Sequence, residues 1–172
     1  PAGQLQSNVP RIGGRRVEGL QHKYPETVLF FPSQGQVCHS YCTFCFRWAQ
    51  FIGDPDLRIA SRETAALTEY LAAHPEVTDV LVTGGDPLVM RTKALRAHLE
   101  PLLATESIRT IRIGTKSLTF WPHRFVTDPD AEDLLALFRA IVASGKHLAV
   151  MAHYNHPREL APAIAREAIA RV

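Results

Sequence analysis

Short apolar runs alternate with amphipathic stretches along most of the chain. Four runs rich in Val, Ile, Leu and Phe are predicted to be strands, at residues 28–31, 80–82, 108–113 and 148–151. Between and after them, apolar residues recur every three or four positions, which is typical of helices that pack on a core. Short strands that alternate with helices predict βαβ units and a parallel sheet. The predicted fold class is therefore α/β, with about four βα units.

The helical stretches also carry boundary signals. Ser61 is expected to cap the first helix, and Asp130 the third. Pro101 is expected to kink the second helix, Gly145 to end the third, and the last helix to start near Ala161. The residues predicted to face the core are Leu67, Tyr70, Leu71, Leu95, Leu99, Leu102, Leu134, Phe138, Ile141 and Val142.

Two regions are expected. Residues 1–27 are polar and interrupted by Gly and Pro, which predicts an irregular N-terminal segment with little core of its own. Residues 28–172 carry the α/β pattern. Because the chain starts at Pro1 and stops inside a helical pattern, we expect it to be truncated at the C-terminus. Four strands do not close a barrel, so the fourth is expected to be an exposed edge.

Polar or glycine-rich residues follow each predicted strand at its carboxyl end. They are the cysteine loop at 38–45, the turn at 84–86, the loop at 114–116 and the histidine pair at 153–156. In a parallel α/β barrel the carboxyl ends of the strands carry the chemistry. We therefore expect these four loops to converge on one edge of the sheet.

Composition narrows the function classes. The chain is 46% hydrophobic and 21% charged, which is ordinary for a globular protein. A net charge of +2 without a basic run argues against nucleic acid as a partner. No apolar stretch approaches the ~18–20 residues of a membrane span, and no signal-peptide pattern opens the chain. All three cysteines lie within eight positions, which favours a reducing cytoplasm and a metal or cluster site over disulfides.

The cysteines form the string C-x3-C-x2-C at Cys38, Cys42 and Cys45. Three thiolates on one loop can bind three irons of a [4Fe–4S] cluster. The fourth iron is then open to the amino and carboxylate groups of S-adenosylmethionine (SAM). A zinc site with His39 as fourth ligand is an alternative, although adjacent residues seldom both reach one ion. An electron-transfer cluster is another, but it needs a fourth cysteine.

The cysteine string, with Phe44 as the aromatic residue before Cys45, resembles the signature of the radical SAM superfamily. Five further motifs occur in the order seen in the lysine 2,3-aminomutase family. They are Tyr24-Pro25 with the strand at 28–31, the run 83–88, Arg112-Ile113-Gly114-Thr115, Pro122-His123-Arg124, and His153-Tyr154-Asn155-His156-Pro157. The resemblance starts near residue 20. It implies that residues 28–172 are the N-terminal part of a parallel (β/α) barrel of the radical SAM type.

The resemblance implies an enzyme that uses a [4Fe–4S] cluster and SAM to generate a 5′-deoxyadenosyl radical for amino-acid chemistry. The expected reaction is a lysine 2,3-aminomutase-type 1,2-amino shift, an isomerisation. The expected partners are a small amino-acid substrate and a reductant such as flavodoxin or ferredoxin. Pyridoxal phosphate (PLP) is expected only through residues beyond this chain, because Lys93, Lys116 and Lys146 do not match the context of the family's PLP lysine. Alternatives are a PLP-independent modification of a peptide or metabolite, and a non-catalytic metal or electron-transfer module.

The resemblance also implies contacts with SAM outside the cysteine string. The turn Gly84-Gly85-Asp86 is expected to meet the SAM amino group, and glycines there allow a close approach of the backbone. The alternative is a plain turn in which Asp86 caps a helix. Gly114 and Thr115 are expected to help seat SAM, with a solvated loop as the alternative.

Two further positions complete the expected site. His153 is expected near the adenosyl part of SAM, whereas His156-Pro157 shapes the turn. Arg47 follows Cys45 by two residues, and the resemblance implies that it holds the substrate carboxylate, which a guanidinium can bind bidentately. The family has a denser basic run here. This chain instead has the more apolar residues Phe46, Trp48, Ala49, Gln50 and Phe51, which argues against lysine as the substrate.

Overall fold

The computed structural model describes residues 8–45, 47–48, 59–62 and 64–172. The first seven residues of the predicted N-terminal segment lie outside this part of the chain. So do Phe46 and residues 49–51 of the predicted apolar stretch.

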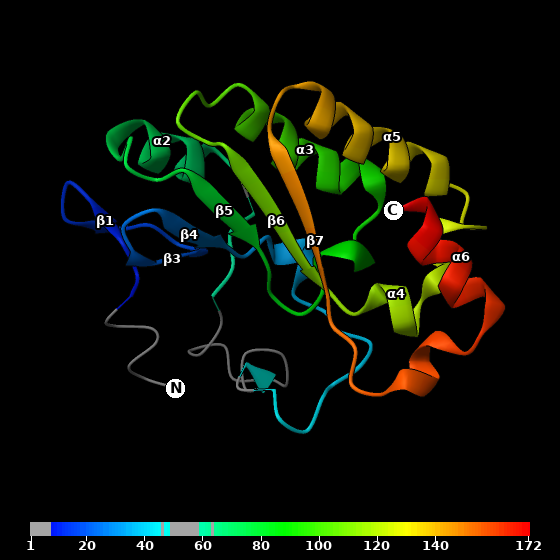
Figure 1. Cartoon of the computed structure of the whole chain (residues 1–172). Coiled ribbons are helices and arrows are strands. Elements are labelled where there is room, and N and C mark those ends of the chain that lie inside the picture. Colours follow the sequence, from blue (N-terminus) through cyan, green and yellow to red (C-terminus); the bar gives the residue numbers. More distant parts are fainter. Residues whose placement is uncertain (1–7, 46, 49–58, 63) are drawn as a thin grey trace.

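A five-stranded sheet forms the centre of the described structure (Figure 1). Its strands, in spatial and chain order, are β3 (Leu20–Tyr24), β4 (Thr27–Phe30), β5 (Asp79–Val82), β6 (Thr110–Thr115) and β7 (His147–Ala152). β3 pairs antiparallel with β4, and the other neighbours are parallel. All four predicted strands are confirmed, and so is the parallel sheet. The fold is mixed α/β, and closure into a barrel remains an expectation.

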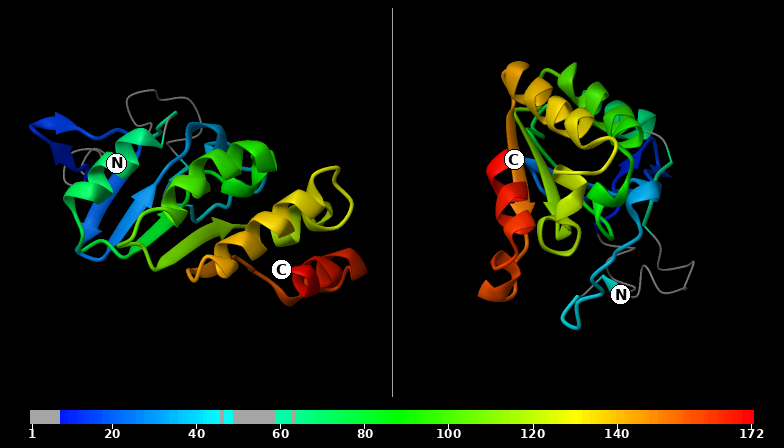
Figure 2. Two further views of the ribbon diagram at one scale, coloured as in Figure 1. Left: turned by 90° about the horizontal axis from the view of Figure 1, so that it is seen from above. Right: turned by 90° about the vertical axis from the view of Figure 1, so that its right-hand side faces the viewer.

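Three helices cover one face of this sheet (Figures 1 and 2). They are α2 (Ala65–Ala73), α3 (Thr92–Leu103) and α5 (Ala131–Ala143). Alternate strand residues point at them and are fully buried: Val28, Phe30, Val80, Val82, Ile111 and Ile113. This alternation is the period of two that places one side of each strand in a core. Burial of the helix-facing side fixes the register and therefore aligns the carboxyl ends of the four parallel strands.

Shorter elements connect or follow these layers. They are η1 (Ser33–Gly35), η4 (Pro87–Val89), α4 (Ser117–Phe120), η5 (Pro122–Phe125), η6 (Pro157–Leu160) and α6 (Ala163–Arg171). In the described residues no strand pairs with the outer edge of β7, as expected for the fourth parallel strand. No helix in this part of the chain is long and apolar enough to cross a membrane.

The N-terminal segment is more ordered than the sequence suggested. β1 (Arg11–Ile12) and β2 (Arg15–Arg16) form a hairpin whose turn uses the positive φ angles of two glycines, and β3 joins the main sheet. Val17 and Leu20 are 3% and 0% exposed and belong to the core. The prediction of an irregular segment is therefore wrong for the described residues 8–27, because its few apolar side chains pack against the domain.

Several helix boundaries need correction. α2 starts after Thr64, and Ser61 instead forms a parallel bridge with Pro32, so the predicted Ser61 cap is wrong. Asp130 does occupy the N-cap position of α5, but its carboxylate bonds Thr92 and Arg124 rather than its own helix. Val142 is exposed, not inward, because it lies one position past the buried Ile141 and about 100° further round α5.

The other two predicted boundaries are close to the structure. Gly145 ends α5 with a φ of +84° and donates its N–H to Val142 O, as predicted. α6 starts at Ala163, two residues after the predicted start. Pro101 lies inside α3 near its C-terminal end.

Candidate cofactor-binding site

A cavity of about 270 Å³ opens at the carboxyl ends of the parallel strands. Its walls come from the loop after β4 and from the ends of β5, β6 and β7. Nine of the predicted site residues line it: Cys38, Cys42, Cys45, Arg47, Gly85, Asp86, Gly114, Thr115 and His153. Gly84 lies in the same turn but does not line the cavity. The expected convergence of the four loops on one edge is confirmed, whereas what these residues bind remains a prediction.

The cysteine loop is fixed at its start to the turn after β5. Gly85 N donates to Gly35 O at 3.1 Å, and Asp86 N donates to Val37 O at 2.8 Å. A Cβ on Gly85 would lie 2.4 Å from Val37 O. Gly84 has a φ of +147°, and a Cβ there would lie 2.1 Å from Gln36 Nε2. Both glycines are thus needed so that residues 36 and 37, at the start of the cysteine loop, can pack against this turn, whether or not the turn also binds a ligand.

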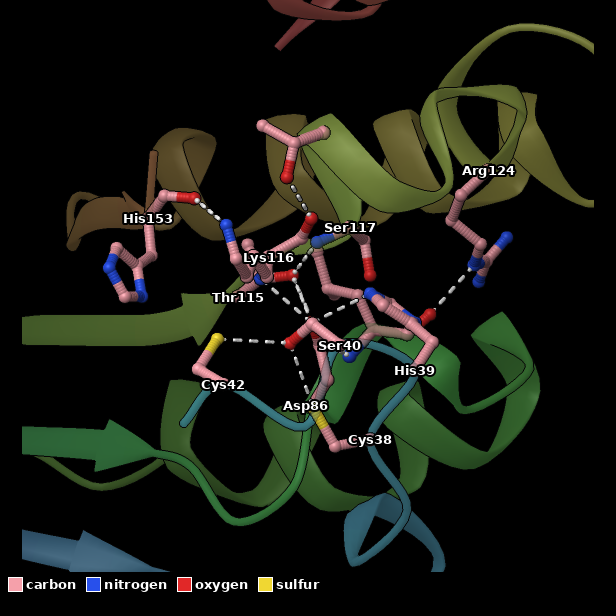
Figure 3. A network of polar contacts seen from close by, with 12 residues as sticks. Cys38, His39, Ser40, Cys42, Asp86, Thr115, Lys116, Ser117, Arg124 and His153 are labelled. Atoms are coloured by element: carbon pink, nitrogen blue, oxygen red, sulfur yellow. Dashed lines mark hydrogen bonds and ion pairs between the residues drawn. The ribbon is translucent and has the colours of Figure 1, made fainter. Parts of the chain in front are cut away.

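Asp86 is only 1% exposed, and its carboxylate accepts three kinds of protein donor. Leu88 N donates to Oδ1 at 3.0 Å, Thr115 Oγ1 to Oδ1 at 2.8 Å and Lys116 N to Oδ2 at 2.7 Å (Figure 3). The bond from Leu88 N caps η4, so the capping role is confirmed. The bonds from residues 115 and 116 join the turn after β5 to the end of β6, and this fixes two walls of the cavity relative to each other.

His39 is directed at Asp86 and away from the cysteine thiols (Figure 3). Its Nε2 lies 3.6 Å from Asp86 Oδ2. Its ring stacks on Phe120 with centroids 5.9 Å apart and planes inclined by 17°. Both contacts give His39 a packing role between three loops, which does not favour the zinc alternative.

The three cysteines are free thiols that line the same cavity. Ser40 Oγ lies 3.3 Å from Cys38 Sγ and 3.5 Å from Cys42 Sγ. Cys45 N donates to Cys42 O at 2.9 Å, which turns the loop back on itself. Among the residues that the structure describes, no three Cys, His, Asp or Glu side chains form a ready-made metal site. The residues fit a [4Fe–4S] cluster because three thiols of one loop share one cavity. The fit lies in the type of donor, since the sulfurs are not already arranged around one ion.

Lys116 is buried and paired, so the alternative of a solvated loop is wrong. It is 5% exposed, its Nζ donates to Glu159 Oε2 at 3.3 Å, and it lies 4.7 Å from the centre of the Phe120 ring. Desolvation by itself would raise the pKa of Glu159. The hydrogen bonds from Asn155 N and Lys116 outweigh this effect and hold that pKa below its usual range. This pair ties the end of β6 to the segment after β7.

His153 comes from that segment. Its backbone N donates to Thr115 O at 2.9 Å, and Lys116 Nζ donates to His153 O at 3.4 Å. Its exposed ring faces Phe44 edge-on at 5.5 Å. His156 Nδ1 accepts from Arg158 N and caps η6, which confirms its predicted role in the turn.

Arg47 brings a cation to the cavity. Its guanidinium lies 4.5 Å from the centre of the Phe31 ring, and Nη2 donates to Gln21 Oε1 at 3.5 Å. Burial lowers the pKa of Arg47 from its usual value to about 10, against the opposing effect of Cys45. The side chain is therefore still charged near neutral pH and can attract an anionic ligand group.

Sequence reasoning assigned no role to several residues of the site. Ser40, Tyr41, Thr83 and Met151 line the cavity. Met151 had a usable signal, because it lies next to the carboxyl end of a strand. Ser40 had a weaker one, its position between two cysteines.

No protein-family model matches the chain. The chain is 42% identical over 145 residues to a putative L-lysine 2,3-aminomutase of Aquifex aeolicus, covering 84% of the chain and 37% of that protein. It is 32% identical over 146 residues to the L-lysine 2,3-aminomutase of Fusobacterium nucleatum, covering 85% and 32%. It is 30% identical over 148 residues to that of Acetoanaerobium sticklandii, covering 86% and 33%.

Over most of its length the chain is thus 30–42% identical to proteins named as L-lysine 2,3-aminomutases or putative ones. The chain belongs to a lysine 2,3-aminomutase-like family. It spans about a third of the length of these curated relatives.

Proposed function

We propose that this chain carries the cluster and SAM site of a radical SAM enzyme of the lysine 2,3-aminomutase type. The observation that carries the proposal is the shared cavity of Cys38, Cys42 and Cys45. Three thiols on one loop are the donor set of a [4Fe–4S] cluster that keeps one iron open. With SAM bound there and an electron supplied, the cluster provides a 5′-deoxyadenosyl radical that abstracts hydrogen from a substrate.

The chain's own residues would bind and orient SAM. Gly85, Gly114 and the β6 end at Thr115 line the cavity, and Gly84 flanks it in the same turn as Gly85. Asp86 cannot contribute a free carboxylate without losing its protein donors, so we assign it to holding the turn rigid. His153 offers an exposed ring beside Phe44 for contact with the adenosyl group.

We propose an amino acid as the substrate, held through its carboxylate by Arg47. The Arg47 guanidinium contacts Phe31 and Gln21, and the Arg47 side chain lines the same cavity as the three thiols. A charge-assisted, bidentate bond suits a carboxylate. From the names of the relatives we propose a 1,2-amino shift, with lysine as the first substrate to test.

PLP enters this proposal only through residues outside the chain. Lys116 is paired with Glu159, and Lys146 Nζ donates to Thr105 O and Ile108 O at 2.9 and 2.6 Å. Both lysines are thus occupied in holding loops. We further propose a reducing, cytoplasmic setting, because the three thiols are free, and a flavodoxin or ferredoxin as the electron donor.

The test is anaerobic reconstitution of the full-length protein with iron and sulfide. Dithionite and SAM are then added, and 5′-deoxyadenosine and β-lysine are measured with lysine and PLP present. We expect SAM cleavage by the wild type and none by Cys42→Ala, with Thr43→Ala as the control in the same loop. A zinc-loaded protein, or a cluster that never cleaves SAM, would favour a non-catalytic module and refute the proposal.

A second candidate is a PLP-independent radical SAM modification of a peptide or metabolite. The observation in its favour is the aromatic surface at the cavity, where Tyr41, Phe44 and Trp48 are 52%, 62% and 52% exposed. Such a surface suits an apolar substrate better than a lysine side chain. SAM cleavage that is stimulated by neither lysine nor PLP would favour this candidate.

A further inference from the structure

Ser40 lies between two of the cysteines both in sequence and in space. Its Oγ is 3.3 Å from Cys38 Sγ and 3.5 Å from Cys42 Sγ, and Figure 3 shows the hydroxyl between the two thiols. All three side chains line the cavity. Among the described residues, the Ser40 hydroxyl makes no other hydrogen bond. Its geometry is therefore set by the two sulfurs.

The number of protons in this trio changes when the cysteines bind iron. As free thiols, Cys38 and Cys42 can each donate an S–H, and the hydroxyl can accept. As iron ligands both are thiolates, which have lost their protons and can only accept. The Ser40 hydroxyl then holds the one proton that the three groups share. It must donate to a thiolate, and the shorter contact favours Cys38.

We propose that Ser40 tunes the reduction potential of the cluster by donating a hydrogen bond to its cysteine thiolates. This inference rests on the proposed function. Hydrogen bonds to the sulfurs are among the features that set cluster potentials. The reduced cluster carries one more negative charge than the oxidised one, so a donor on the sulfur stabilises the reduced form more. Ser40 therefore raises the potential and makes the electron easier to deliver.

The loop contains its own matched control. Thr43 also carries a hydroxyl and also lies between two cysteines, Cys42 and Cys45. It is exposed, does not line the cavity, and its hydroxyl makes no hydrogen bond to a sulfur in the described part of the chain. Thr43→Ala therefore reports the loss of a hydroxyl from this loop alone, whereas Ser40→Ala also removes the hydroxyl that contacts the sulfurs.

The experiment is an anaerobic redox titration of the reconstituted full-length protein, monitored by electron paramagnetic resonance of the reduced cluster. Wild type, Ser40→Ala, Ser40→Thr and Thr43→Ala are compared at equal iron and sulfide content. We expect the midpoint potential of Ser40→Ala to shift to a more negative value. Ser40→Thr, which keeps a donor, should have a midpoint potential close to that of the wild type, and Thr43→Ala should match the wild type.

The outcomes separate the two claims. A wild type without a cluster refutes the proposed function, and the tuning role with it. A cluster whose potential is the same in wild type and Ser40→Ala refutes the tuning role alone. An equal shift in Thr43→Ala also refutes it, because any change in the loop would then suffice. If Ser40→Ala holds no cluster while Ser40→Thr does, the hydroxyl serves assembly, and the tuning role is likewise refuted.

Discussion

Arg124 Nη1 donates to Asp130 Oδ1 at 2.7 Å from a side chain that is 1% exposed. The same guanidinium donates through Nε to Leu88 O at 3.1 Å, the bond drawn in Figure 3, and through Nη2 to Met90 O at 3.1 Å. Leu88 N in turn donates to Asp86. The buried Arg124 guanidinium thus holds the segment that follows the turn after β5, and its ion pair with Asp130 connects the start of α5 to the wall of the cavity.

Loss of this cation should be costly. Arg124→Met leaves the carbonyls of Leu88 and Met90 without this donor and removes the cation beside the partly exposed Asp130, so we expect it to lower the free energy of unfolding by about 2–4 kcal/mol. The measurement is urea denaturation. Arg112→Met is the matched control, because Arg112 bonds Asp79 bidentately at 2.9 Å but both side chains are partly exposed, 27% and 20%. A loss as large for Arg112→Met would contradict the special role of burial at Arg124.

The pH dependence of the same pair has a defined sign. Desolvation by itself would raise the pKa of Asp130. The hydrogen bonds from Thr92 and the charge of Arg124 outweigh this effect and lower that pKa below its ordinary 3.8. Stability from this group is therefore present above pH 3.8 and is lost as the pH falls further. Asp130→Asn should show a weaker loss of stability below that pH than the wild type. Parallel acid unfolding curves for the two proteins would contradict this.

The contact between Gly85 and the cysteine loop supplies a third prediction. In Gly85→Ala the new Cβ would lie 2.4 Å from Val37 O, so the start of the loop must move. We expect a loss of about 1–3 kcal/mol, the range for overpacking, and reduced iron content after reconstitution. In Gly114→Ala the nearest atom would be Thr83 Oγ1 at 3.7 Å, an ordinary contact. Equal iron content in the two variants would mean that the loop does not depend on this approach.

The strands and the edge that carries the site could be predicted because both follow from local patterns. The four apolar runs became β4 to β7, and the loops that follow them line one cavity. A parallel sheet with a buried face allows one arrangement of its carboxyl ends, so residues as distant as Cys38 and His153 could be assigned to one edge. This assignment could be made without knowing any contact between residues distant in the sequence.

Other features could not be predicted because distant partners decide them. Asp130 is a residue type that commonly caps helices, but its carboxylate accepts hydrogen bonds from Thr92 and Arg124 instead of from its own helix. The two glycines of the β5 turn suggested room for a ligand, and the contact that requires them is with Gln36 and Val37. The alternative of a solvated loop fails at Lys116 because its partner Glu159 lies 43 residues further along the chain.

Arg47 supplies a prediction that depends on pH. Because burial lowers its pKa to about 10, the side chain should hold a carboxylate unchanged from neutral pH to about 9 and release it as the pH rises through 10. KM for the amino-acid substrate should rise over that window in the wild type. Arg47→Ala should raise KM about 10- to 100-fold at neutral pH, the equivalent of one charged hydrogen bond, and remove this alkaline rise. Equal weakening of SAM binding, measured by the spectral change of the cluster, would contradict a role toward the substrate.

His98 supplies the last prediction, on stability. It lies on α3, is 5% exposed, contacts Phe30 edge-on at 5.5 Å, and its Nδ1 lies 2.8 Å from Thr64 Oγ1. Burial lowers the pKa of His98 below its ordinary 6.5, so the folded protein favours the neutral ring. Below pH 6.5 the unfolded chain binds a proton that the folded chain resists, and the free energy of unfolding falls.

The comparison of wild type with His98→Gln isolates this effect, because other groups titrate equally in both. Urea denaturation at pH 7.5 and 5.5 should show a larger loss of stability on acidification in the wild type than in the variant. Since the variant also loses ring packing against Phe30, it should be less stable at pH 7.5, and only the difference between the two pH values reports the proton. An identical difference in both proteins would mean that His98 takes up a proton in the folded state as readily as in the unfolded chain, and its burial would then impose no cost on the charged ring.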